Sequence, residues 1–256
     1  MSWPPAWPGS GARWEGELDP AYVVTHMEED RLHWWFRGRL AVLLAVLRRA
    51  LPPRRVRLLE LGCGSGNVLG ALREFGEAVG MEANPDLAAA ARAEGLDVRA
   101  GRLPGDLVVP PGWADVVLFL DVLEHLDDER AALETARRAL GEGGLLVVTV
   151  PAYQWLWGVH DVVLGHRRRY TAQGLRRVVE QAGFNVLRVS YFNALLFPAV
   201  ALTRAWKRLT GDATHDLRRP APTLNRGLER VFALERHVVP RCALPFGVSV
   251  LLLARR

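Results

Sequence analysis

The stretch Leu59-Glu60-Leu61-Gly62-Cys63-Gly64-Ser65-Gly66-Asn67 decides the fold. It joins an apolar, β-like run, Val56–Leu61, to a helix-like stretch, Gly66–Phe75. The three alternate glycines let the backbone turn tightly and approach a ligand closely. The amide groups that open the following helix suit a carboxylate or a phosphate. The stretch therefore predicts a strand–loop–helix unit with a ligand at its loop.

Short apolar runs alternate with helical patterns on either side of this loop. The predicted strands are Val56–Leu61, Ala78–Glu82, Leu96–Ala100, Ala114–Leu120, Leu145–Val150, Phe184–Phe192 and Phe246–Ala254. Such alternation predicts right-handed βαβ crossovers and an α/β, doubly wound sheet with helices on both faces. Ligands of these sheets bind beyond the carboxyl ends of the strands, near the point where strand order reverses.

Three segments lie outside this alternation. Residues 1–17 are rich in Pro, Gly and Trp and predict a flexible tail. Residues 18–52 predict a helical N-terminal lid, with one helix from Tyr22 to Leu51. Residues 194–245 predict two inserted helices before the last strand. At 256 residues the chain suits one large domain, which we expect over 18–256.

An acidic residue, Glu82, ends the second predicted strand, 20 positions after Gly62. A carboxylate at this position can accept hydrogen bonds from both ribose hydroxyls of a nucleoside. The glycine loop and this acid together predict an adenosine-type cofactor. A dinucleotide site requires Gly or Ala where Asn67 stands, and an acid such as Glu60 before the first glycine is unusual there. A nicotinamide-dependent oxidoreductase remains the alternative enzyme.

With these residues the chain resembles the class I S-adenosylmethionine-dependent methyltransferases. Their acid-x-Gly-x-Gly-x-Gly loop matches Glu60–Gly66, and Glu82 matches the acid that ends their second strand. The Asp-x-Leu-Glu-His signature of small-molecule members matches Asp121–His125, and a Gly-Gly turn at 143–144 precedes the fifth strand. The resemblance spans roughly residues 32–254. It implies S-adenosylmethionine as cofactor and a seven-stranded, mostly parallel, Rossmann-like sheet whose last strand is antiparallel.

The resemblance also implies which residues contact the cofactor. Arg39 is expected to pair with the cofactor's carboxylate, with Arg37 as the alternative, and Cys63 to pack closely rather than act as a nucleophile. Many members place an acid after Gly101, but Arg102 stands here, which transfers the adenine contact to Leu103 or to the backbone. The implied cofactor-binding residues are Glu60, Gly62, Cys63, Gly64, Gly66, Glu82, Ala83, Leu103, Asp121, Val122, His125 and Arg39.

The loop after the fifth predicted strand, residues 151–170, combines aromatic side chains, two histidines and a basic run. Similar methyltransferases cover the acceptor with this loop. We therefore expect His160, His166 and Tyr170 to be the catalytic residues. The competing interpretation gives both histidines structural hydrogen bonds and makes Arg167–Arg169 a solvated turn.

The chemistry implied by the resemblance needs few catalytic groups. The sulfonium methyl is already activated, so we expect direct in-line transfer without a metal. Alignment alone can contribute roughly 7–11 kcal/mol. A general base helps only where the nucleophile must lose a proton. The predicted reaction is methyl transfer to oxygen or nitrogen of a small or lipid-linked acceptor, and a non-catalytic, methyltransferase-like binding module is the remaining alternative.

The net charge of +5 is unevenly distributed. Residues 193–256 carry 11 basic and 4 acidic side chains, whereas residues 51–192 are slightly acidic. Two interpretations stay open for the helices of 194–239: a pair of plain surface helices, or a cap that meets a lipid-linked acceptor or, weakly, a membrane surface. The single Lys among many Arg indicates coding bias, and the chain has no Asn/Asp-Pro-Pro-Tyr/Phe tetrapeptide, so no nucleic-acid partner is expected.

The sequence also bears on location. The N-terminus lacks the basic start and apolar run of a signal peptide. The longest apolar run, Asn193–Thr203, is too short to span a bilayer. Two cysteines cannot form a disulfide framework. These features predict a cytoplasmic protein, with peripheral membrane contact as the alternative.

Overall fold

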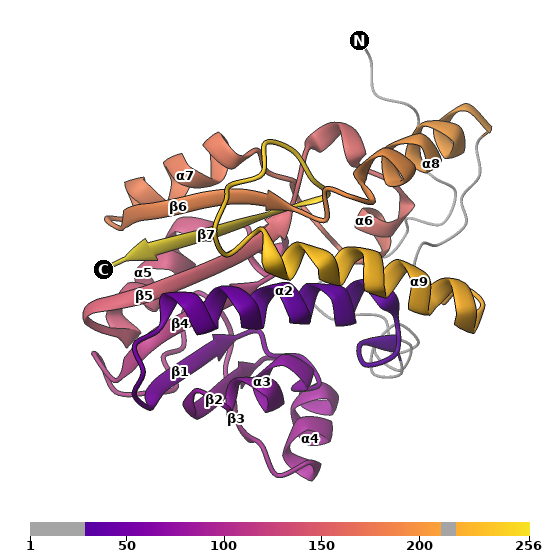
Figure 1. Ribbon diagram of the computed structural model, residues 1–256. Helices are drawn as coiled ribbons and strands as arrows, with labels where there is room; N and C mark the ends of the chain where they lie inside the picture. The colour runs from indigo at the N-terminus through magenta and orange to yellow at the C-terminus, as the bar shows by residue number, and fades with distance from the viewer. Residues whose placement is uncertain (1–28, 211–218) are drawn as a thin grey trace, which may run out of the picture.

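A computed structural model describes residues 29–210 and 219–256. Its centre is a seven-stranded sheet in the order β3-β2-β1-β4-β5-β7-β6 (Figure 1). β7 runs antiparallel to β5 and β6, and the other neighbouring strands are parallel. The predicted fold class is confirmed, with strand order reversing between β1 and β4. The strands are β1 (Val56–Leu61), β2 (Gly76–Glu82), β3 (Asp97–Ala100), β4 (Ala114–Leu120), β5 (Leu140–Pro151), β6 (Asn185–Phe192) and β7 (Ser249–Arg255).

Helices cover both faces of the sheet, as the near-continuous apolar strands require. One core layer packs α5 and α7 against the sheet, and a second packs α2, α3 and α9 against its other face. Short 3-10 turns occupy Leu123–His125, Gln154–Leu156 and Leu234–His237. The helices are α2 (Trp34–Ala50), α3 (Asn67–Leu72), α4 (Pro85–Ala93), α5 (Glu129–Ala139), α6 (Val159–Val163), α7 (Ala172–Gln181), α8 (Phe197–Thr210) and α9 (Pro222–Ala233).

Side-chain caps fix where three of these helices begin. The Asn84 side chain accepts hydrogen bonds from two amides at the start of α4, and Pro85 occupies the first helical position. Asp128 caps α5 through the Ala131 amide, and Thr171 caps α7 through the Gly174 amide. Each cap marks the end of the loop that precedes its helix.

Several boundaries differ from the sequence prediction. α2 begins at Trp34, because the His33 side chain accepts a hydrogen bond from the Trp35 amide and caps the helix there. The second of the two inserted helices ends at Ala233 and continues as a 3-10 turn. β7 begins at Ser249 rather than Phe246, and β5 starts five residues early, at Leu140.

The inserted residues 194–245 contain α8 and α9. α9 lies alongside α2 in Figure 1, where Gly38 leaves room for the Phe232 ring: a Cβ at Gly38 would lie 2.4 Å from Phe232 Cδ1. Among the helices in the described part of the chain, none combines the length and hydropathy needed to cross a membrane. The tail predicted over 1–17 lies outside the described residues.

Candidate functional site

The glycine loop joins the end of β1 to the start of α3. Gly62, Gly64 and Gly66 have φ angles of 76°, 55° and 84°. This left-handed region disfavours any residue with a Cβ. Space is short as well, because a Cβ at Gly62 would lie 2.8 Å from Cγ2 of Val122. Val122, one of the predicted cofactor-binding residues, therefore packs directly on the loop.

Glu82, at the end of β2, is fixed against this loop. Its Oε2 accepts a hydrogen bond from the Gly64 amide at 2.9 Å, and its Oε1 accepts one from the Asn84 amide at 2.8 Å. Ala83 lies between these two contacts in the chain. The loop and the acid thus form one unit at the carboxyl edge of the sheet, as predicted.

Two buried side chains, Glu60 and Cys63, belong to the glycine loop and the strand end before it. Burial raises the pKa of Glu60 to about 8, with Arg39 opposing the shift and Glu82 adding to it. Burial also raises the pKa of the Cys63 thiol, so it is a poor nucleophile. Cys63 fits against Gly80, where a Cβ would lie 2.5 Å from its sulfur. A packing role accounts for this cysteine.

The N-terminal segment covers the loop. The Ser65 hydroxyl donates a hydrogen bond to the Asp30 carboxylate, and the Asn67 amide group donates one to the Asp30 carbonyl at 2.7 Å. Arg39 reaches the same edge from α2, where its guanidinium pairs with Asp121 and lies 5.0 Å from the Trp35 ring centroid. We expected Arg39 to meet the cofactor's carboxylate; in this structure Asp121 is its partner.

Three non-glycine residues with left-handed backbone follow the ends of β4, β5 and β6. They are Asp121, Tyr153 and Asn193, with φ angles between 55° and 58°. Because these strands run in the same direction, all three residues lie at the carboxyl edge. Strained backbone of this kind concentrates at functional sites. Sequence reasoning identified Asp121 but missed Tyr153 and Asn193; their place just after an apolar strand was the available signal.

A histidine group lies beyond β4 and β5. The rings of His125 and His166 are 4.7 Å apart between centroids, and those of His160 and His166 are 6.2 Å apart. Burial lowers the pKa of His125 to about 3, which keeps this ring neutral at pH 7. The structure thus brings together the two histidines predicted for the acceptor side and the one predicted for the cofactor.

Asp161 holds this group in place. Its fully buried carboxylate lies 2.8 Å from His166 Nδ1 and accepts hydrogen bonds from Arg169 Nε at 2.7 Å and from the Gly158 amide at 2.8 Å. These partners hold the pKa of Asp161 well below its usual range, although burial opposes them. Because an ionised carboxylate only accepts, His166 carries its proton on Nδ1.

Tyr170 and Leu103 are placed differently. The Tyr170 side chain is buried in the core, and its hydroxyl donates to Glu129 Oε2 at 2.5 Å, so the structure does not bring it to the histidine group. Leu103 packs against the same core layer. After Gly101, the Arg102 amide donates to the carboxylate of Asp106 at 2.7 Å, so an acid does lie near this turn.

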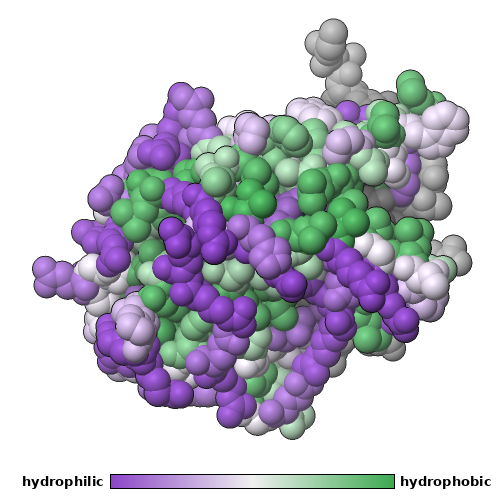
Figure 2. Space-filling view, in the orientation of Figure 1, coloured by the Kyte–Doolittle hydropathy of each residue, from purple (hydrophilic) through white to green (hydrophobic). Residues whose placement is uncertain are grey.

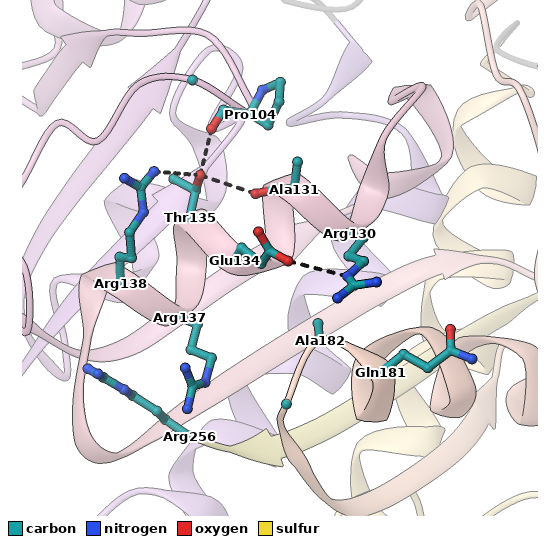
Figure 3. Close-up of a pocket in the computed structure, with 12 residues that line it drawn as sticks. Pro104, Arg130, Ala131, Glu134, Thr135, Arg137, Arg138, Gln181, Ala182 and Arg256 are labelled. Atoms are coloured by element: carbon teal, nitrogen blue, oxygen red, sulfur yellow. Dashed lines mark hydrogen bonds and ion pairs between the residues drawn. The ribbon is translucent and has the colours of Figure 1, made fainter.

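A separate cavity of about 770 Å³ lies between α5, the turn after α7 and the C-terminus (Figure 3). Its lining includes Arg130, Arg137, Arg138 and Arg256, and Thr135 binds the Pro104 carbonyl at one end. No predicted site residue lines it. We therefore place the functional site at the carboxyl edge and not in this cavity.

Comparison with known proteins bears on the family of this chain. A family profile described as a methyltransferase domain matches residues 34–189. A probable S-adenosylmethionine-dependent methyltransferase of Mycolicibacterium smegmatis is 31% identical over 159 residues, which cover 60% of each chain. The chain belongs to the S-adenosylmethionine-dependent methyltransferases. The predicted family and cofactor are confirmed.

A second relative of this methyltransferase matches less of its length. A ubiquinone biosynthesis O-methyltransferase of Xylella fastidiosa is 29% identical over 115 residues, 42% of this chain and 47% of that protein. The chain therefore spans about half to 60% of these relatives. A Haloferax volcanii putative methyltransferase, solved with the Trm112 methyltransferase activator, superposes with a TM-score of 0.61 at 19% identity, covering 92% of this chain and 94% of that one. That likeness shows the fold.

Proposed function

We propose that this methyltransferase transfers the methyl group of S-adenosylmethionine in line to an oxygen or nitrogen of a small or lipid-linked acceptor. The observation that carries the proposal is that two groups lie at the carboxyl edge of the sheet: Glu82 hydrogen-bonded to the glycine loop, and the histidine group held by Asp161. The carboxylate proposed to bind the nucleoside and the histidines proposed to contact the methyl acceptor thus lie at the sheet edge where ligands of doubly wound sheets bind.

The residues present fit the cofactor. Each carboxylate oxygen of Glu82 accepts one backbone hydrogen bond and keeps a lone pair for a ribose hydroxyl. The three glycines with positive φ angles leave the backbone open to close approach. Glu82, Ala83 and the loop would hold the nucleoside, and Val122 would close the site from the β4 side.

When bound, the cofactor supplies an activated sulfonium methyl. The chain's own task is then to align the acceptor and to exclude water, and alignment can contribute roughly 7–11 kcal/mol. We assign His160 and His166 to contact with the acceptor, with Asp161 fixing the orientation of the His166 ring. Tyr170 would support this loop through its hydrogen bond to Glu129.

An aromatic cluster supports an acceptor with an apolar part. Tyr153 stacks on Tyr191 with ring centroids 5.0 Å apart, and on Trp155 at 5.7 Å. Phe197 contacts both Tyr153 and Trp155 edge-on at 5.9 Å. Sequence reasoning did not single out this cluster. A cluster of aromatic side chains next to a few fixed polar groups is typical of small-molecule sites.

α8 supports a lipid-linked acceptor. Arg204 lies 3.8 Å from buried Asp161, and Arg208 donates to the Trp157 carbonyl at 3.0 Å. α8 therefore turns these cations toward the loop after β5 and leaves apolar side chains outside, seen over α8 in Figure 2. The large apolar side chains exposed on α8 are Leu202, Trp206 and Leu209, at 71%, 66% and 84%. An exposed apolar stripe of this kind suits a membrane surface.

Turnover tests the proposal. The purified chain is incubated with S-adenosylmethionine and phenolic, carboxylate or amine acceptors, with and without a lipid tail, and S-adenosylhomocysteine is measured. We expect product above the acceptor-free rate, and faster turnover of tailed acceptors in phosphatidylglycerol vesicles. No product with any acceptor would favour the non-catalytic binding module.

A separate experiment tests whether α8 contacts a membrane surface. Trp206→Ser should weaken sedimentation with phosphatidylglycerol vesicles, because it removes an exposed aromatic side chain from α8. Leu187→Ser is the matched control, since Leu187 is also exposed, at 49%, but lies on β6. Equal sedimentation of both variants and the parent chain would remove α8 as a membrane contact.

A further inference from the structure

Glu124, His125 and His166 bring their ligating atoms together. One carboxylate oxygen of Glu124 and one ring nitrogen from each histidine all lie within 4.8 Å of one another. Glu124 and His125 belong to the 3-10 turn after β4, and His166 follows α6. The cluster therefore joins two loops at the carboxyl edge, next to Asp121.

Glu124 is the most informative member of this cluster. Its side chain is fully buried, and neither of its carboxylate oxygens has a hydrogen-bond partner within the described chain. A buried polar group without a partner costs stability, and such exceptions call for an explanation. A cation bound between Glu124 and the two imidazoles would give these oxygens the partner that the protein does not provide.

His166 is held as metal-binding histidines usually are. Imidazoles that bind metals mostly donate their second ring N–H to a carboxylate or a backbone carbonyl. His166 meets this description, because its Nδ1 lies 2.8 Å from Asp161 and its Nε2 is left to ligate. Asp161 is itself held by a hydrogen bond from Arg169, so the residues that orient the His166 ring are fixed as well.

We propose that Glu124, His125 and His166 bind a divalent transition-metal ion of the Zn²⁺ class. Imidazole ligands suit such ions, whereas Mg²⁺ and Ca²⁺ prefer oxygen ligands. Two histidines and one carboxylate are also a ligand set of catalytic zinc sites, in which a further position stays open for water or substrate.

This site revises the expectation that no metal is needed. That expectation considered the leaving group, which is already activated, and not the acceptor. The open position would take an oxygen or nitrogen of the acceptor, so that His166 acts on the acceptor through the ion rather than by direct contact; this step rests on the methyl transfer proposed above. The nearby cations are already neutralised, since Arg39 pairs with Asp121 and Arg169 with Asp161.

Metal titration tests the site without any turnover. The full chain, free of a polyhistidine tag and treated with a chelator, is titrated with Zn²⁺ by calorimetry and with Co²⁺ by visible absorption. We expect one ion per chain, d–d bands of Co²⁺ with nitrogen ligands, and much weaker binding of Mg²⁺. Glu124→Gln keeps the shape of the side chain and should weaken Zn²⁺ at least about tenfold, as should His166→Ala.

His237→Ala is the control, because His237 is an exposed histidine on the 3-10 turn after α9. It should bind Zn²⁺ like the parent chain. Absence of stoichiometric binding, Glu124→Gln binding equal to the parent, or equal Mg²⁺ affinity would overturn the site. S-adenosylhomocysteine affinity is measured on the same samples: its loss counts against the proposed function, whereas metal failure with this affinity intact rejects the metal site alone.

Discussion

Glu82 accepts a hydrogen bond from the amide of Gly64 at 2.9 Å. The contact ties the end of β2 to the loop that follows β1, two strands that run parallel with Leu61 beside Met81. The acid that we propose to bind the nucleoside is thus fixed to the glycine loop before any ligand arrives. Such preorganisation reduces what the protein must order on binding.

Gly62→Ala should destabilise the chain and abolish cofactor binding. The left-handed backbone alone costs about 1–2 kcal/mol for a residue with a Cβ. The added methyl would also lie 2.8 Å from Val122 Cγ2 and push it off the loop. Gly95→Ala is the matched control, because Gly95 has a similar φ of 74° but open space around it. Urea unfolding and S-adenosylhomocysteine titration distinguish the two; equal affinity in both variants contradicts the packing argument.

Glu60 should make the ligand-free protein less stable as pH rises. Its folded pKa is raised to about 8 from an ordinary value near 4.5. The folded state therefore keeps a proton that the unfolded state has lost, and stability falls between about pH 5 and pH 8. One such group contributes at most about 1.4 kcal/mol per pH unit.

Glu60→Gln should flatten this dependence, because the amide does not titrate. Glu77→Gln, an exposed acid on β2, should leave it unchanged. Free energies of unfolding measured in urea at several pH values provide the comparison. If the Glu60→Gln and parent curves run parallel from pH 5 to pH 8, the raised pKa is wrong.

Asp161→Asn should cost far more stability than Asp127→Asn. Asp161 is fully buried and pairs with Arg169 and His166, so losing its charge leaves Arg169 buried without its ionic partner. Removing one partner of a buried pair costs about 3–5 kcal/mol. Asp127 pairs with Arg167 at 2.7 Å but is 78% exposed, and exposed pairs contribute less than about 1 kcal/mol. Similar losses in the two unfolding curves would count against this assignment.

The sequence predicted the parts of this protein that depend on local pattern. The glycine spacing and the apolar strands are short-range signals, and the structure places them as expected. The boundaries that differed depend on contacts between distant residues. β7 begins at Ser249 because the chain before it must first pass Phe192, where Gly247 fits against the backbone.

The site was predicted less completely, for the same reason. Tyr153 and Asn193 follow apolar strands, but that place in the chain does not by itself reveal their positive φ angles. Arg39 could be placed near the cofactor, but its partner Asp121 lies 82 residues away in the chain. The orphaned carboxylate of Glu124 is likewise visible only once burial is known.

Calorimetric titration with S-adenosylhomocysteine tests the central claim most directly. We predict saturable binding at one molecule per chain. Glu82→Gln should weaken it roughly tenfold to 100-fold, because a hydrogen bond to a charged group contributes about 1.5–3 kcal/mol. The control Glu77→Gln should bind like the parent chain. No binding by the parent chain would contradict the account, and unchanged affinity in Glu82→Gln would contradict the role given to that carboxylate.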